Sequence, residues 1–164
     1  MIDEPLPNYR FIVTLDPGDA YLPPAQAALV ALFPGGAFSE VKGLGGDLEV
    51  MPYAEGGRND FVHQLPVRHS WTRITLTRGV VREPGLWYWY LAGQTQSLGA
   101  RRDGAILLLT PAGTPAMAWT FRGGIAAKWS GPELSGTGAS VAVESLEIAH
   151  HGVLTVPLSP PLTP

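Results

Sequence analysis

The chain has 164 residues, a formal net charge of −3 and no cysteine. This length supports one ordinary domain, and the lack of cysteine excludes disulfide scaffolds, thiolate metal sites and a cysteine nucleophile. The 11 Lys and Arg residues are scattered and outnumbered by 14 Asp and Glu residues, which argues against a basic face for nucleic-acid backbone. Gly (20) and Pro (16) together have nearly twice their average share, which favours short strands joined by turns over a helical bundle.

The N-terminal third of the chain begins with a predicted tail and a predicted strand. Residues 1–8 are acidic and proline-rich, which indicates an extended segment and not a secretory signal peptide. Tyr9–Leu15 is rich in β-branched and aromatic residues and ends at an Asp-Pro-Gly turn signal, so we predict a strand there. Residues 16–37 separate it from the next strand. Their segment Pro23–Phe33 is compatible with a short helix or a loop, and its apolar run is too short to span a bilayer.

Two strand pieces and a long loop are predicted next. The strand pieces are Phe38–Val41 and Leu48–Tyr53, separated by a glycine-rich segment. Ala54–Pro66 is polar and glycine-rich and therefore predicts a long loop.

The middle of the chain carries the clearest strand and helix signals. Within Ser70–Arg78, Ile74 and Leu76 alternate with threonines, which predicts a strand with the two apolar side chains facing inward. Pro84–Gln96 has a proline near its start and four consecutive aromatic residues, which favours a helix.

The second half repeats the strand pattern. Ala105–Thr110 is bounded by turn signals, Met117–Phe121 alternates bulky and small side chains, and Ala126–Trp129 is a further short strand candidate. In Val141–His150 the apolar positions change parity halfway, which predicts a bulge or a strand with apolar partners on both faces. Residues 153–164 are proline-rich and predict a second tail.

Together these elements predict a mainly β fold, an antiparallel β-sandwich or barrel with one flanking helix. Residues 9–152 form this single domain between the tails 1–8 and 153–164. An antiparallel sheet packs one face and exposes the other. With only 15% charged residues, part of the exposed face is expected to lie against another protein. The free sheet edges also need a partner, which a ring of identical subunits supplies.

No recognised catalytic motif occurs in the sequence. The four histidines are His63, His69, His150 and His151, and the last two point to opposite faces of a strand, so one metal ion cannot easily use both. Gly43–Asp47 resembles a phosphate-binding loop only superficially, because a strand and an acidic residue follow the glycines. We therefore expect no catalytic residue, no metal site and no cofactor, and we do not expect an enzyme.

Two classes of function remain open from the residues alone. The first is a self-assembling structural subunit. The second is a monomeric β-sandwich binding module for a carbohydrate or protein ligand, which requires several tryptophans exposed together in a groove. The aromatic run has a simpler reading, in which a short helix lays Trp87 and Leu91 on the sheet core.

Nine segments between residues 8 and 152 resemble, in order, the tail-tube protein family of contractile phages and phage-derived injection systems. No single segment is decisive, and their shared order makes the resemblance specific. The segments are Asn8–Phe11, Phe38–Leu44, Tyr53–Asn59, Leu65–Pro66, Trp71–Gly79, Leu86–Trp89, Trp119–Phe121, Lys128–Pro132, and Val143–His150 with Gly152.

The resemblance implies a tail-tube (Hcp-like) β-barrel fold and a structural role without an active site. It implies homo-hexameric rings that stack into a hollow tube inside a contractile sheath, joined to a baseplate hub and spike, with DNA or protein cargo passing through the lumen. It also implies assembly in the bacterial cytoplasm, a place in a phage tail or an injection particle, and no membrane insertion by this chain.

The resemblance further implies that the loop Tyr53–Pro66 reaches a neighbouring ring. The expected contact residues are Glu55, Gly56, Gly57, Arg58 and Asn59. A glycine pair suits a loop that approaches another backbone closely, and a mobile surface loop is the alternative.

Two features depart from the family pattern. Residues 16–37 are a longer insertion, and the tail after Gly152 is unusually rich in proline. They leave open whether the chain is the bulk tube subunit or the initiator ring at the baseplate.

Overall fold

The computed structural model describes residues 6–8, 10–15, 38–57, 60–82, 84–96, 100–138 and 140–158. These residues form the predicted mainly β architecture with one flanking helix. The segment 16–37, which includes the helix or loop predicted at Pro23–Phe33, lies outside the described residues. The elements are β1 (Phe11–Leu15), β2 (Glu40–Lys42), β3 (Gly46–Tyr53), β4 (His63–Trp71), β5 (Ile74–Gly79), α2 (Gly85–Gln96), β6 (Arg102–Leu109), β7 (Pro115–Ser130), β8 (Val143–Ala149) and β9 (Val153–Pro157).

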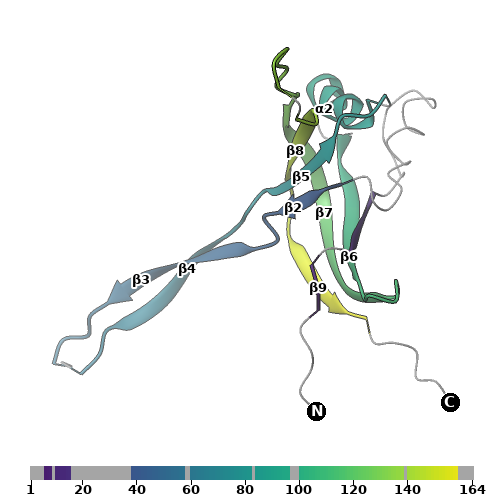
Figure 1. Cartoon of the computed structure of the whole chain (residues 1–164). Coiled ribbons are helices and arrows are strands. Elements are labelled where there is room, and N and C mark those ends of the chain that lie inside the picture. Colours follow the sequence, from purple (N-terminus) through teal and green to yellow (C-terminus); the bar gives the residue numbers. More distant parts are fainter. Residues whose placement is uncertain are drawn as a thin grey trace.

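The body of the molecule consists of two antiparallel sheets that share the long strand β7 (Figure 1). Sheet A contains β1, β6, the first half of β7 and β9. Sheet B contains β2, β5, β8 and the second half of β7. Because one strand belongs to both sheets, their relative orientation is set by the bend in that strand.

Two glycines in the middle of β7 produce this bend. Gly123 has a φ of 59°, which favours glycine. The register against β6 shifts across the pair, between Phe121 and Gly124, and the register against β8 shifts after it, between Ala126 and Lys128. A side chain at Gly124 would place its Cβ 2.7 Å from the Phe121 ring and 2.9 Å from the Arg102 carbonyl oxygen. The strands predicted at 117–121 and 126–129 are therefore parts of one continuous strand, β7, which the glycines bend but do not interrupt.

Strands β8 and β9 follow one another along β7. Ala149 pairs with Ile125 and Val153 pairs with Phe121, so the register is the same on both sides of the connection. The backbone N–H of His151 continues the line by donating to the Arg122 carbonyl at 2.9 Å. The prediction of a tail from residue 153 onward is therefore wrong for β9, in which every residue from Val153 to Pro157 is in register with β7.

The core lies between the two sheets and the helix. In β5 the alternation predicted from the sequence is confirmed, since Ile74 and Leu76 are fully buried. The helix turns a different face inward than predicted: Leu86 and Trp89 are fully buried, whereas Trp87 and Leu91 are half-buried. The Trp89 indole donates to the Ala100 carbonyl at 2.8 Å, which satisfies its polar atom in the core. The other fully buried large side chains are Val13, Phe121, Leu146 and Ile148.

Strand β8 keeps one parity along its whole length. Glu144, Leu146 and Ile148 are buried, and β8 pairs with β5 without a register shift. The register shift lies in β7 opposite β8, between Ala126 and Lys128. The predicted change of parity was wrong. The inward-facing position 144 carries the charged Glu144, and the apolar Val143 is exposed on the other face, so the apolar pattern changes parity although the buried face of the strand does not.

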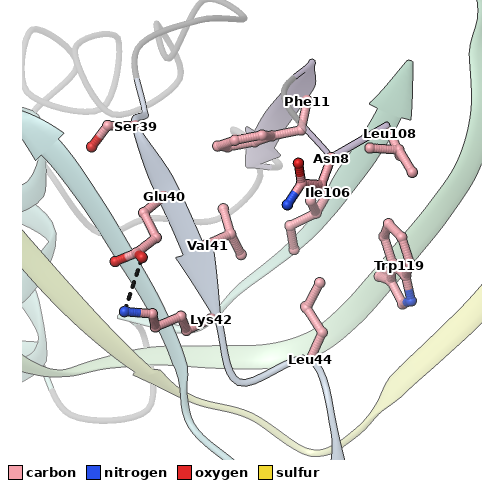
Figure 2. Close-up of a pocket in the computed structure, with 10 residues that line it drawn as sticks. All are labelled: Asn8, Phe11, Ser39, Glu40, Val41, Lys42, Leu44, Ile106, Leu108 and Trp119. Atoms are coloured by element: carbon pink, nitrogen blue, oxygen red, sulfur yellow. Dashed lines mark ion pairs between the residues drawn. The ribbon is translucent and has the colours of Figure 1, made fainter. Parts of the chain in front are cut away.

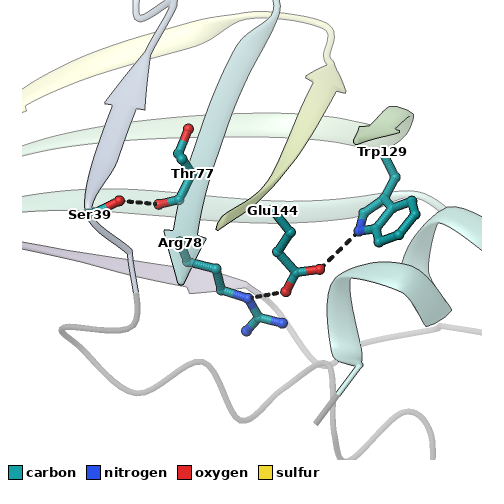
Figure 3. Close-up of polar contacts among 5 residues, drawn as sticks. All are labelled: Ser39, Thr77, Arg78, Trp129 and Glu144. Atoms are coloured by element: carbon teal, nitrogen blue, oxygen red, sulfur yellow. Dashed lines mark hydrogen bonds and ion pairs between the residues drawn. The ribbon is translucent and has the colours of Figure 1, made fainter. Parts of the chain in front are cut away.

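Glu144 belongs to a buried polar cluster in sheet B (Figure 3). Arg78 Nε donates to Glu144 Oε1 at 2.7 Å, and Trp129 Nε1 donates to Glu144 Oε2 at 3.0 Å. The two charged side chains are only 4% and 7% exposed. The carboxylate thus joins β5, β8 and β7, and the Trp129 ring packs on Trp87 of α2 with centroids 4.8 Å apart.

Replacing Gly124 by Ala is expected to destabilise the fold, because its Cβ has no room beside Phe121 and Arg102. We expect the free energy of unfolding to fall by about 1–3 kcal/mol, measured by urea denaturation. Gly45→Ala is the matched control, since nothing lies within 4 Å of its added Cβ. Equal stability of the two variants would contradict the role of Gly124 in the bend.

Replacing Glu144 by Gln is expected to cost about 3–5 kcal/mol of unfolding free energy, because it removes the carboxylate charge that faces the buried Arg78 guanidinium. The double variant Arg78→Met/Glu144→Leu removes both charges and is expected to recover most of this loss. Urea denaturation of the three proteins measures the difference. A double variant as unstable as Glu144→Gln would show that the charge imbalance is not the cause.

Candidate assembly interface

Strands β3 and β4 form a hairpin, here called the arm, that projects away from both sheets (Figure 1). The eight residues of β3 extend it by roughly 26 Å at about 3.3 Å per residue. The loop predicted over Ala54–Pro66 is wrong from residue 63 onward, because β4 begins at His63. Pro66 is tolerated there because both strands of the hairpin are edges and the ladder has a bulge between Glu49 and Val50.

The arm exposes apolar side chains on both of its faces. All residues of β3 are exposed, and the consecutive Val50 (49%) and Met51 (50%) point to opposite faces. A two-stranded hairpin is at best marginally stable in water, and a large exposed apolar surface marks an interaction site. The arm therefore has the properties of a segment that is covered by another protein. Its exposed large apolar residues are Leu48, Val50, Met51, Tyr53, Phe61, Val62, Leu65, Val67 and Trp71.

The base of the arm is fixed to the body by a glycine and a histidine. Gly43 has a φ of 84°, and a Cβ there would collide with the Arg73 carbonyl oxygen. His150 Nδ1 accepts the Gly152 N–H at 3.2 Å, so its Nε2 carries the hydrogen and donates to the Thr72 carbonyl at 2.9 Å. The direction of the arm is thus set by contacts at its base.

The histidines are placed for packing and backbone contacts. The His69 ring lies edge-on to Trp71 with centroids 4.4 Å apart, and His63 Nε2 lies 3.3 Å from Glu55 Oε2 near the tip of the arm. Among the residues that the structure describes, no three His, Cys, Asp or Glu side chains are grouped to hold a metal ion.

Three of the five predicted contact residues lie at the tip of the arm. Glu55, Gly56 and Gly57 are exposed, and no atom lies within 4 Å of a Cβ added to either glycine. Gly57 has a φ of 88°, which favours glycine in the turn. Arg58 and Asn59 lie outside the described residues. The contact role of all five stays a prediction.

Sequence reasoning missed the apolar flanks of the arm. These flanks include Leu48 (52% exposed), Met51 (50%), Leu65 (41%) and Val67 (56%). The available signal was the run from His63 to Trp71, where apolar residues recur although the surrounding segment is polar.

An apolar hollow of about 570 Å³ lies between the open edges of the two sheets (Figure 2). Its polar rim includes Glu40 and Lys42, whose charges pair at 2.9 Å. Among the described residues that line this hollow, the charged side chains are Glu40 and Lys42, which pair with each other. Its apolar lining is Phe11, Val41, Leu44, Ile106, Leu108 and Trp119.

The outer face of sheet B carries one carboxylate between two cationic side chains. Glu147 Oε1 lies 3.2 Å from Lys128 Nζ, and Glu147 Oε2 lies 3.3 Å from Arg73 Nη1. The Lys128 ammonium, with a further contribution from Arg73, holds the pKa of Glu147 below its ordinary value. This face is therefore polar and suited to water.

The tryptophans do not gather in one exposed groove. All five lie in the described part of the chain, and of these five only Trp71 is exposed, at 39%. Trp89 is fully buried, and Trp87, Trp119 and Trp129 are half-buried. This arrangement does not favour a monomeric carbohydrate-binding module.

The fold matches several solved structures over nearly its whole length. A chain of the anti-feeding prophage (AFP) baseplate is 22% identical, with a TM-score of 0.77, and the match covers 95% of this chain and 98% of that one. A chain of the PVC sheath–tube complex, an extracellular contractile injection system, is 23% identical, with a TM-score of 0.73 and coverages of 96% and 95%. A chain of the AFP tube-terminating cap is 24% identical, with a TM-score of 0.75 and coverages of 96% and 95%.

The sequence itself identifies the family. No curated protein matches the chain. Within the described residues, no helix has the length and apolar character needed to cross a membrane. The family model described as T4-like virus tail tube protein gp19 matches residues 7–154, which is most of the chain. The chain therefore belongs to the T4-like tail tube protein family, whose members are structural subunits of a tube.

Proposed function

We propose that this tube subunit forms homo-hexameric rings that stack into a hollow tube, with the arm as the contact between subunits of neighbouring rings. The observation that carries the proposal is the arm, a two-stranded hairpin with half-exposed apolar side chains on both faces. Fully burying one large apolar side chain contributes about 1.5–3 kcal/mol. A neighbouring subunit that covers several of them supplies a stabilisation that the single chain lacks.

The outer edges of the sheets support lateral association. In the described part of the chain, β1, β2 and β9 each pair with one strand only. A free edge offers unpaired N–H and C=O groups to another chain. In a closed ring each subunit covers the same edge of its neighbour, which leaves no open end.

The partners of such a tube follow from the same proposal. The solved relatives come from a baseplate, a sheath–tube complex and a tube-terminating cap, which supports a contractile sheath and a baseplate hub or spike as partners. The lumen cargo is DNA in a phage or a protein effector in an injection system. Assembly takes place in the bacterial cytoplasm, before the particle acts outside the cell.

The position of the ring in the tube has two candidate answers. A bulk subunit gives tubes that lengthen with protein concentration, whereas an initiator ring at the baseplate gives rings that do not lengthen. The insertion 16–37 and the residues after β9 are the departures from the family pattern that bear on this choice.

The first test is the mass of the purified protein by light scattering, with negative-stain imaging of the same sample. We expect tubes or stacked rings for the natural chain and single, unstacked rings for Met51→Ser/Leu65→Ser, because both side chains are exposed on the arm, the proposed contact between rings. The unfolding free energy of the variant should change little for the same reason. Leu6→Ser is the matched control, since Leu6 is 40% exposed, close to Leu65 at 41%, and lies outside the arm and before the first strand β1. A natural chain that stays monomeric at high concentration, or stacks formed equally by the arm variant, would contradict the proposal.

The tip of the arm is tested by Gly57→Val. Valine is strained at a φ of 88°, so we expect a distorted tip, an unchanged body and hindered stacking. Gly113→Val is a close control, because Gly113 has a φ of 86° and equally open surroundings in the turn between β6 and β7. Negative-stain counts of tubes and rings compare the two variants. Normal tubes from Gly57→Val would remove the tip from the contact.

A further inference from the structure

A second exposed apolar surface, here called the end patch, lies where β5 ends and β8 begins. It consists of Val80, Val81, Val141 and Val143, which are 47%, 48%, 79% and 47% exposed. The Val80 N–H donates to the Ala142 carbonyl at 2.9 Å, which holds the two segments side by side. In Figure 1 this end of the body lies near α2, and the arm extends away from it.

The end patch borders a hollow of about 420 Å³ with a mixed lining. Val141 and Val143 form its apolar part. Its polar part consists of hydroxyl groups from Thr77, Ser130, Ser140 and Ser145 and of the carboxylates of Glu133 and Glu144, the second of which is bonded to Arg78 and Trp129. A hollow of this kind fits a side chain with an apolar body and a polar end.

Tyr53 at the end of β3 is a side chain of that kind. It is 52% exposed near the tip of the arm, and its phenol combines an aromatic ring with a hydroxyl group. Tyrosine is enriched at interfaces because its ring is buried while its hydroxyl finds a hydrogen-bond partner. Met51 points to the same face of β3 as Tyr53 and pairs with Leu65 of β4, so the ring lies beside an apolar pair.

The charges near the two surfaces are compatible with this contact. Glu55 and Asp60 lie at the tip of the arm, and the exposed Arg82 directly follows Val81 at the end patch. Arg82 attracts these carboxylates, whereas the exposed Glu133 in the lining of the hollow repels them, so the contact orients the tip toward Arg82 and away from Glu133.

The arm of one copy is directed away from the end patch of the same copy. Its base is held by Gly43 and by the His150 hydrogen bonds, which fix its direction. The arm is roughly 26 Å long, so its tip lies beyond the body of its own copy. A contact between two different surfaces of identical chains is heterologous, so it repeats from copy to copy instead of closing on itself in a pair.

We infer that Tyr53 of one copy inserts into the hollow beside Val141 and Val143 of a second copy, in the neighbouring ring. This inference rests on the proposed stacking of rings and adds the surface on which the arm docks. The partner is a second copy of this chain, because the same molecule carries both the mixed hollow and a tyrosine-tipped arm that fits it.

Cross-linking tests this contact cleanly because the chain has no cysteine. Met51→Cys and Val141→Cys are made as separate proteins, mixed, assembled and treated with a short thiol-to-thiol cross-linker. We expect a cross-linked dimer from the mixture and little from either protein alone. The matched control mixes Met51→Cys with Leu154→Cys, whose site on β9 has a comparable exposure of 63%.

The anchoring role of Tyr53 is tested in the same assay. Tyr53→Ala in the Met51→Cys protein is expected to reduce the cross-linked product about tenfold or more, and Tyr53→Phe should reduce it less because the ring remains. Stronger cross-linking to Leu154→Cys, dominant linkage of Met51→Cys to itself, or no linkage at all would overturn the inference.

Imaging of the same samples separates the two proposals. Stacked rings without the Met51–Val141 linkage would overturn the docking surface and leave the tube proposal intact. Failure of both assembly and linkage would overturn both. If Val141→Cys cross-linked to an added sheath protein and not to Met51→Cys, the end patch would be assigned to the sheath protein. That result would also overturn the inference.

Discussion

The shared strand β7 is the constraint on which the rest of the structure depends. Its first half belongs to sheet A and its second half to sheet B, and the bend at Gly123–Gly124 sets the angle between them. β8 and β9 follow this bend in one continuous register. The buried Glu144 then ties β7 to β5 and β8, and the helix closes the core through Trp89. The arm leaves this framework in a fixed direction because its base is bonded to the β8–β9 connection.

The same framework explains why the chain is suited to assembly. The apolar side chains of its core are buried within one molecule, whereas its arm and its end patch expose apolar surface in different places. Placing unlike surfaces on a rigid body favours a repeating contact between copies over a closed pair. The polar outer face of sheet B, with Glu147 between Lys128 and Arg73, remains suited to water in such an assembly.

Much of the fold was predictable from local patterns, and the errors have definite physical causes. The alternation in β5 and the aromatic run of α2 were read correctly as strand and helix because both signals are local. The parity of β8 was misread because Glu144 is buried against Arg78, a partner that is distant in sequence. The start of β4 was misread as a loop because it follows a polar, glycine-rich segment, and β9 was misread as a tail because the residues around and after it are rich in proline.

The sequence by itself determined the strand-rich fold class, the single flanking helix and, through its ordered segments, membership of the tail tube family. These follow from side-chain periodicity, turn residues and motif order, which are properties of neighbouring positions. The tertiary structure decided that residues 46–71 form a projecting arm, that one strand serves two sheets, and that the valines at 80, 81, 141 and 143 meet in one patch. These depend on strand pairing and on surfaces brought together across long sequence separations, which local patterns do not encode.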